Sequence, residues 1–512
     1  MPRLKFGRGF LWYNIQDLSA RGRTADTEKE GVRVEKTKRY MVFLLVMAGC
    51  GGMLFDFGGT IIGPALPYIG PVEDNPGSLG LFTTAQVSHL SSAVVMCAAI
   101  ACLAAGWLAE KLGRKLMMLI SAAVAALACL PICIAEGNYA MFFLGRAMQG
   151  VAAGFIGVVV PMYLAECLDA NSRGKGAGMF QLLDFIGITF CSVVGLVVVH
   201  TIGAADDASV TAAQKSLAWK TIFWSSAAPA ILFFLGALGL RESPRWLYRR
   251  GRKEEALAAL AANNGEAKAR EILDEMMASD AAEAAEKAAL AAAAKGDTLF
   301  QKKYVLPFCI SLAILICNQA IGFNAIQYFS IPMFMKAGLS QATANAANFV
   351  VWLVPIPVTA VALSLVDRSG RKTLLKIGTV GMVIALAGVA SMFLLLEKGI
   401  ASGGNFAGWM TVGGIALFVA SFSIGPGVVV WLALSELMPS RIRANGMAIA
   451  LFVNQMVAFA IADAFLPWQK ACGYAAVFYC LAGFAFLYFL AAAFLLPETK
   501  GKTLEEIEEY WK

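Results

Sequence analysis

Long apolar runs dominate this chain, and each is about 20 residues or longer, enough for a helix to cross the roughly 30 Å of hydrocarbon in a bilayer. Hydrophobic residues make up 59% of the 512 residues and charged residues only 15%, a composition too apolar for a soluble globular protein. The runs lie near residues 40–69, 85–108, 116–135, 140–165, 176–200, 219–240, 304–336, 342–366, 373–396, 407–434, 445–467 and 473–496. The sequence therefore predicts an all-α membrane protein with twelve transmembrane helices.

The twelve runs form two sets of six, separated by a charged segment. This segment is rich in Ala, Glu, Lys and Arg, a composition typical of solvated amphipathic helices. We therefore expect two six-helix bundles and a cytoplasmic helical insert between them. The expected divisions are an N-terminal arm at 1–39, a first bundle at 40–240, the insert at 241–303, a second bundle at 304–496 and a C-terminal tail at 497–512.

Basic residues gather in alternate loops. They lie in the arm, the insert, the tail and the loops that contain Arg114, Arg173, Arg371 and Arg443, whereas the intervening loops carry acids such as Asp206. Cytoplasmic loops of membrane proteins are enriched in Lys and Arg, so both termini and the insert are predicted to be cytoplasmic. No apolar segment precedes residue 40. We therefore expect no cleavable signal peptide and an integral protein of the cell (plasma or inner) membrane.

Two loop motifs recur in the same order in each half. Glu110–Lys115 reads EKLGRK and Asp367–Lys372 reads DRSGRK, and later in each half an acid precedes an arginine by seven residues. Such repetition is expected of two parallel six-helix repeats. Since arginine binds carboxylates strongly, these residues are predicted to latch the cytoplasmic side, and the alternative is that they only mark topology. The predicted latch residues are Glu110, Arg114, Glu166, Arg173, Asp367, Arg371, Glu436 and Arg443.

Several other functions are disfavoured. The 11 cysteines lie mostly inside apolar runs, without the spacing of a metal site or a disulfide framework. The net charge of +7 is spread over alternate loops, which does not indicate a nucleic-acid partner. The spacing of a phosphate-binding loop is absent, so ATP-driven transport is not supported. We expect no enzyme, no cofactor and no metal.

Motifs along nearly the whole chain resemble those of the sugar porter family of the major facilitator superfamily. They are EKLGRK, GR at Gly145–Arg146, PMYLAE and RG between Pro161 and Gly174, ESPRWL at Glu242–Leu247, DRSGRK, SELMPSRIR, and PETKGKT at Pro497–Thr503. Small departures are Glu110, where the family usually has Asp, and Arg241, where it often has Pro. The resemblance implies alternating access by two six-helix bundles around a central sugar site.

Amide side chains in the seventh apolar run favour a site for a polyhydroxylated solute. Asn and Gln both donate and accept hydrogen bonds, as sugar hydroxyls require. Asn318, Gln319 and Asn324 lie in the stretch NQAIGFN, whose glycine permits a bend. For each amide the alternative is a role in holding two helices together.

The resemblance implies further sugar contacts. NQAIGFN is similar to the family's QQ-x-x-G-x-N motif, with Asn318 in place of the first Gln. Gln181 matches a sugar-binding Gln of the family. Trp431, which follows the bend GPG at Gly425–Gly427, resembles the tryptophan that packs on the sugar.

The resemblance also shows departures within the expected pocket. Asn454 is a candidate sugar contact in the eleventh run, where the family often has a Trp and a later Asn. In the eighth run, Pro355 stands where the family commonly has a sugar-binding Asn. We therefore expect a rearranged pocket, whose preferred sugar does not carry over from the family.

Acids inside the apolar runs point to proton coupling, because a charge at membrane depth costs about 2.5 kcal/mol or more. Proton-coupled members of the family carry a first-span Asp that pairs with the fourth-span Arg, here Arg146. This chain has Gly58 at that position and Asp56 two residues earlier. Two residues turn a helix by about 200°, so Asp56 is expected to face away from Arg146 unless the helix is distorted. Asp184 is the second candidate, and its alternative is a static pair with Arg146.

Three other titratable residues lie near the outer ends of apolar runs or within them. Asp463 in the eleventh run is a weaker third candidate for proton coupling. For His89 and His200 a solvated or capping role is expected.

Together these features predict alternating-access transport of a monosaccharide, with import coupled to protons. The expected partners are a small sugar, the proton and the lipid bilayer, and the chain is expected to function as a monomer. The alternatives are an uncoupled facilitator of a sugar or polyol and a non-transporting sugar receptor.

Overall fold

The computed structural model describes residues 25–168, 170–266, 268–278, 301–438 and 442–497. Regular structure in these residues is helical, and they contain no β-strand. Helices suit the apolar runs because a segment inside a bilayer has to pair its backbone N–H and C=O groups within itself. The predicted all-α membrane fold is confirmed.

The first half of the chain forms six apolar spans. Three of these are interrupted once, so that α1 and α2, α4 and α5, and α8 and α9 each form one span. The helices are α1 (Ala25–Thr60), α2 (Ile62–Ile69), α3 (Thr84–Leu112), α4 (Arg114–Leu127), α5 (Cys129–Ile134), α6 (Tyr139–Cys167), α7 (Ala170–Thr201), α8 (Ala212–Trp224) and α9 (Ala227–Gly239).

The insert and the second half follow. The insert contains α10 (Pro244–Arg249), α11 (Lys253–Asn264) and a helical stretch at 268–278. The second half contains α13 (Lys302–Ala320), α14 (Phe323–Lys336), α15 (Gln341–Leu353), α16 (Pro355–Ser369), α17 (Arg371–Glu397), α18 (Asn405–Ile424), α19 (Pro426–Leu437), α20 (Arg443–Leu490) and the π-helical turn η1 (Ala491–Leu495).

The last apolar segment is a reversal rather than one helix. Within the described residues, 11 helical segments are long and apolar enough to cross a membrane, and the last of them has 50 residues. A straight helix of that length would measure about 75 Å, more than twice the hydrocarbon thickness. Gly473 inside α20 has φ 83° and ψ 163°, which is not helical. The glycine therefore divides α20 into two crossings, which agrees with twelve crossings in all.

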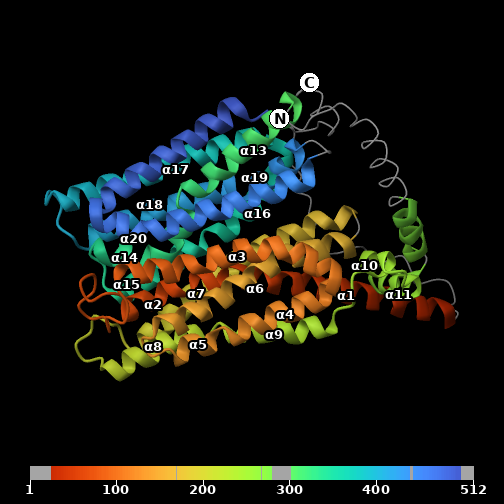
Figure 1. The fold of residues 1–512 in the computed structure, drawn as a ribbon, viewed down its shortest axis with the longest axis horizontal. Coiled ribbons are helices and arrows are strands. Elements are labelled where there is room, and N and C mark those ends of the chain that lie inside the picture. Colours follow the sequence, from red (N-terminus) through yellow and green to blue (C-terminus); the bar gives the residue numbers. More distant parts are fainter. Residues whose placement is uncertain (1–24, 169, 267, 279–300, 439–441, 498–512) are drawn as a thin grey trace, which may run out of the picture.

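The two halves lie side by side, and the insert helices lie at one end of them. In Figure 1, α1–α9 form one group of roughly parallel helices and α13–α20 form the other. Helices α10 and α11 lie at one end, where α11 packs on α1. We call this the insert end and the opposite one the far end.

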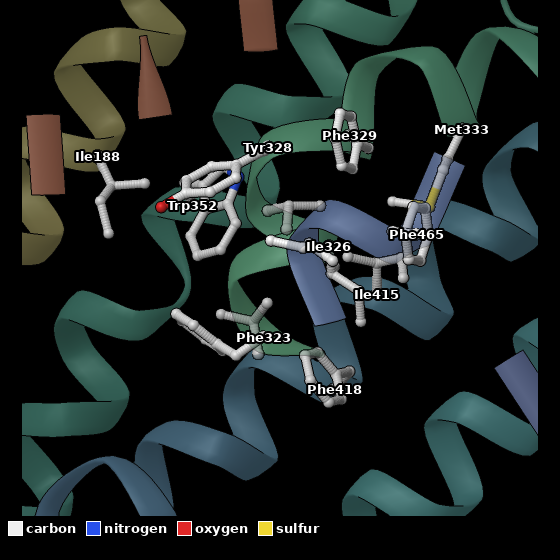
Figure 2. Packing of buried hydrophobic residues seen from close by; sticks show 14 of the residues in the cluster. Ile188, Phe323, Ile326, Tyr328, Phe329, Met333, Trp352, Ile415, Phe418 and Phe465 are labelled. Atoms are coloured by element: carbon white, nitrogen blue, oxygen red, sulfur yellow. The ribbon is translucent and has the colours of Figure 1, made fainter. Parts of the chain in front are cut away.

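Aromatic side chains fill the core on the side of the second half that meets the first. Figure 2 shows Tyr328 of α14 and Trp352 of α15 facing Ile188 of α7. The ring of Phe323 lies 5.8 Å from that of Trp352, in an edge-on arrangement that typically contributes about 0.5–1.5 kcal/mol beyond burial. Trp352 is fully buried, so the halves are in direct contact at this level.

Buried hydrogen bonds join the two halves towards the far end. Thr189 Oγ1 of α7 donates to the Trp352 carbonyl oxygen at 2.7 Å. Asn348 Nδ2 of α15 donates to Ser192 Oγ at 2.9 Å, one turn further along α7. Because an unpaired buried polar group is costly, separating the halves here would cost free energy unless water replaced these contacts.

Candidate functional site

The seventh span is broken at Gly322, as its sequence predicted. Helix α13 ends at Ala320 and α14 begins at Phe323, and Gly322 between them has φ 78° and ψ 27°. This left-handed conformation is one that glycine adopts without steric cost. The break lies between Gln319 and Asn324 and so places one amide on each side of the bend.

The predicted sugar-binding amides fall into two groups. Gln181, Gln319 and Asn324 are only partly buried, whereas Asn318 is 3% exposed and Asn454 is fully buried. Only the first group has surface available to a solute in this conformation. The second group is enclosed by protein.

The two enclosed amides hold other groups in place. Gln319 Nε2 donates to Asn454 Oδ1 at 3.3 Å, and Asn454 Nδ2 donates to the Leu315 carbonyl oxygen at 2.9 Å. The amide of Gln319 is thus oriented by α20. Asn318 Oδ1 accepts from the hydroxyl of Tyr488 at 3.3 Å, which matches the alternative role of joining two helices.

Several predicted residues lie where the structure describes no side chains. Trp431 is in α19, which begins at Pro426 directly after the bend at Gly425, but its side chain lies outside the described residues. The side chains of four predicted latch residues also lie outside the described residues, namely Arg173, Asp367, Glu436 and Arg443. Their roles stay predictions.

Asp56 and Asp184 lie on two helices that pack closely. On α1, a Cβ at Gly52 would collide with the carbonyl oxygen of Phe180 on α7, so the backbones touch there. Asp56 and Asp184 each follow four residues later, about one turn along these helices, so the two acids lie near each other. Asp184 is 5% exposed; its Oδ2 accepts from Gln181 Nε2 at 3.2 Å, and its Oδ1 has no partner in the described part of the chain. An acid pair therefore adjoins a predicted sugar contact.

Arg146 is bound by neutral groups. Its Nε donates to the Leu90 carbonyl oxygen at 2.9 Å, and its Nη1 donates to Gln149 Oε1 at 2.7 Å and to the Gly58 carbonyl oxygen. Its Nη2 donates to the Gly59 carbonyl oxygen at 3.2 Å. The static pair of Arg146 with Asp184, considered from the sequence, is not formed. The arginine instead binds the backbone of α1 shortly before that helix ends.

A glutamine that the sequence analysis missed connects the second half to the acid pair. Gln327 Nε2 of α14 donates to Thr60 Oγ1 of α1 at 2.6 Å, and Thr60 Oγ1 donates to the Asp56 carbonyl oxygen at 2.8 Å. Gln327 is 1% exposed. Its position three residues after Asn324, on the same helical face, was the signal that could have identified it.

At the insert end, three of the predicted latch residues of the first half, Glu110, Arg114 and Glu166, form a network within that half, and their role as a latch stays a prediction. Arg114 Nη2 donates to Glu110 Oε1 at 2.5 Å and to Glu166 Oε1 at 2.8 Å. Ser243 Oγ, at the start of α10, donates to Glu166 Oε2 at 2.5 Å. The network therefore joins α3, α4, α6 and the insert. In the second half, Arg371 Nη1 donates to the Val366 carbonyl oxygen at 3.4 Å.

Glu242 is a part of this network that sequence reasoning did not assign. Its Oε1 accepts from the backbone N–H groups of Arg114 at 2.8 Å and Lys115 at 3.1 Å, at the N-terminus of α4. A carboxylate is favourable there because the helix dipole is positive at that end. Gly113 has φ 95°, and a Cβ on it would collide with Glu242. The acid at the start of ESPRWL was the available signal.

Comparison with known proteins gives a consistent result. A family model described as "Sugar (and other) transporter" matches residues 30–511. The "Arabinose-proton symporter" of Escherichia coli (strain K12) is 29% identical, over 92% of this chain and 93% of its own length. The "Major myo-inositol transporter IolT" of Bacillus subtilis (strain 168) is 28% identical, over 92% of this chain and 94% of its own length. "Sugar transporter ERD6-like 16" of Arabidopsis thaliana is 28% identical, over 98% of this chain and 96% of its own length.

Solved structures agree in fold. The inward open conformation of the xylose transporter XylE from Escherichia coli superposes with a TM-score of 0.74 at 23% identity, over 92% of this chain and 100% of that one. At this level of identity the match concerns the arrangement of the helices.

Proposed function

The chain belongs to the sugar transporter family and has the major facilitator fold, and from this premise we propose that it imports a monosaccharide together with protons. It is a transporter of sugars and not an enzyme. In the proposed orientation the insert end is cytoplasmic and the far end faces outward, in keeping with the basic loops. Alternate opening of the two ends would carry the solute across the plasma or inner membrane, with one chain as the working unit.

The proposed sugar site consists of the partly buried amides Gln181, Gln319 and Asn324. The observation that carries this assignment is the bend at Gly322, with Gln319 held by Asn454 on one side and Asn324 on the other. A fixed amide can replace water around a sugar hydroxyl with little loss of side-chain freedom. Asn318 and Asn454 are proposed to support the site rather than contact the solute.

The proposed proton carriers are Asp56 and Asp184. Two negative charges side by side inside a membrane protein are costly, so a pair of this kind can hold and release a proton as its surroundings change. Asp184 also accepts a hydrogen bond from Gln181, which supports the proposal that the proton binds next to the sugar. Arg146 neutralises neither acid directly, and we assign it the role of fixing the end of α1.

Thr60 and Gln327 offer a route from the proton to the movement of the two halves. Thr60 contacts the Asp56 backbone on one side and Gln327 of the other half on the other. These bonds link the helical turn that carries Asp56 to the other half, and we propose that a change in the charge of the Asp56 side chain weakens this link at the far end. This contact would make closure depend on protonation.

A specific observation favours a second candidate, uncoupled transport of a sugar or polyol. In proton-coupled members of the family, the arginine at this position pairs with an acid. In this chain, Arg146 binds carbonyl oxygens and Gln149 instead. A similar protein is a myo-inositol transporter, so polyols belong among the substrates to be tested.

The deciding experiment is uptake into proteoliposomes with and without an imposed pH gradient. Labelled pentoses, hexoses and myo-inositol are offered singly. Coupled import predicts accumulation above the external concentration, abolished by a protonophore. Uptake that only reaches equilibrium and ignores the protonophore would show the uncoupled candidate, and binding without uptake would indicate a receptor.

A further inference from the structure

A polar cluster at the far end joins α3 of the first half to α20 of the second. His89 Nδ1 lies 2.6 Å from Asp463 Oδ1, and Ser92 Oγ donates to the same oxygen at 2.7 Å. Ser88 Oγ donates to the Asp463 backbone oxygen at 2.5 Å. His89 is exposed to solvent, as expected, and its imidazole also bonds a carboxylate of the opposite half.

The cluster is open to solvent from the far end. The side chain of His89 is 51% exposed and that of Asp463 is 23% exposed. A crevice of about 430 Å³ begins about one helical turn from His89 and Asp463, lined by Thr83, Thr84, Ala85, Pro467, Lys470 and Ala471. Protons from the outer solution thus reach the imidazole without crossing the protein.

Opening of the far end would break these contacts. Helices α3 and α20 belong to different halves, so any movement that separates the halves at this end takes Asp463 away from His89, Ser92 and Ser88. The contacts favour the closed far end, and their strength contributes to how readily that end opens.

Other titratable and charged groups lie near the His89–Asp463 contact. Tyr139 of α6 faces the charge of Asp463. At the rim, Lys470 binds Glu73 and lies near Asp74. This hydrogen bond and the lysine charge hold the pKa of Glu73 below its usual range, so the Glu73–Lys470 bridge keeps its charges between about pH 5 and 8.

We propose that His89 and Asp463 form a latch on the far end that acid in the outer solution tightens. Histidine is the side chain whose charge ordinarily changes between about pH 5 and 8. When the imidazole is protonated, the contact is an ion pair; as the pH rises it becomes a neutral hydrogen bond and weakens. A half-exposed pair of this kind should shift the ratio of closed to open far end by about two- to fivefold.

The chain offers a matched control, because it contains two histidines. His200 also lies near the far end, but its Nδ1 bonds the Leu196 carbonyl oxygen of its own helix. His89→Gln keeps a hydrogen-bonding side chain that does not titrate, and His200→Gln makes the same chemical change away from the latch.

The test is hydrogen exchange of the reconstituted full chain at pH 5.5 and 7.5, with correction for intrinsic rates. We expect peptides covering 84–95 and 458–470 to be about two- to fivefold more protected at pH 5.5 in the wild type and in His200→Gln. His89→Gln should remove this difference. Asp463→Asn should also remove it and lower protection at pH 5.5, which provides a second variant if His89→Gln folds poorly.

Two results would overturn the latch. One is a wild-type pH response in both His89→Gln and Asp463→Asn. The other is loss of the response in His200→Gln as well, which would place its origin elsewhere. Neither result bears on which solute is carried or on the roles of Asp56 and Asp184, so failure of the latch is distinguishable from failure of the proposed function.

Discussion

Gln327 and Thr60 lie 2.6 Å apart across the boundary between the two halves of the chain, one helical turn beyond Asp56. The bond joins a broken helix that carries predicted sugar contacts to the helix that carries a predicted proton carrier. In an alternating-access transporter such a contact has to form and break once in each cycle. Its loss should therefore change the balance between conformations.

Thr60→Val should favour opening of the far end. Valine keeps the shape of threonine but offers no acceptor, so Gln327 Nε2 loses its partner in a buried position at a cost of about 1–3 kcal/mol to the closed state. Hydrogen exchange should increase in α14. Thr379→Val is the control, because Thr379 is also fully buried but bonds Leu375 in its own helix. Equal exchange in the two variants would contradict a role for the contact in closure.

Asp56→Asn and Asp184→Asn should uncouple transport. Asparagine keeps the size and polarity of the acid but cannot take up a proton, so accumulation against a gradient should stop while downhill sugar exchange continues. The measurement is labelled-sugar uptake with an imposed pH gradient. Asp207→Asn, in an exposed loop at the far end, should leave accumulation intact. If both intramembrane variants still accumulate sugar, neither acid carries the proton.

Gln319→Ala should raise the KM for sugar by about fivefold to a hundredfold, the equivalent of one lost hydrogen bond of about 1–3 kcal/mol. Asn454→Ala should raise it less, because Asn454 acts by orienting Gln319. The double variant should resemble Gln319→Ala alone, since the two residues form one unit. Additive effects would show that Asn454 contacts the sugar itself. An unchanged KM in Gln319→Ala would remove that residue from the site.

Gly113→Ala should destabilise the first half at the insert end. The backbone at Gly113, with φ 95° and ψ 159°, is one that glycine alone adopts readily and that costs alanine about 1–3 kcal/mol, and the added Cβ would displace Glu242 from the start of α4. The melting temperature of the purified protein should fall. Gly106→Ala is the control, because Gly106 is inside α3 with open space around its Cβ position, and alanine should stabilise it by about 0.5–1 kcal/mol. A similar melting temperature for the two variants would contradict the role given to Gly113.

Features that depend on neighbouring residues were predictable from the sequence. The apolar runs became helices because length and hydropathy alone decide whether a segment can cross a bilayer. The bend at Gly322 followed from the freedom of glycine next to polar side chains. The Arg114–Glu166 contact joins residues 52 apart and was indicated instead by a motif that occurs twice in the chain.

Features that depend on how distant segments meet were not predictable in the same way. His89 and Asp463 are 374 residues apart, and only the packing of α3 on α20 brings them together. The partners of Arg146 are mainly backbone carbonyl oxygens, which every residue type carries, so the sequence does not reveal them. The neighbourhood of Asp56 and Asp184 depends on the close approach at Gly52, which no pattern within one helix reveals.

The reversal at Gly473 bears on how the chain enters a membrane during synthesis. Because α20 turns back at one glycine, and Glu397 accepts from the backbone N–H of Ala475 just beyond it, there is no polar loop between the last two crossings to be translocated on its own. These two crossings therefore amount to one helical hairpin for the insertion machinery, and a tag or glycosylation site placed at the turn would interrupt that hairpin.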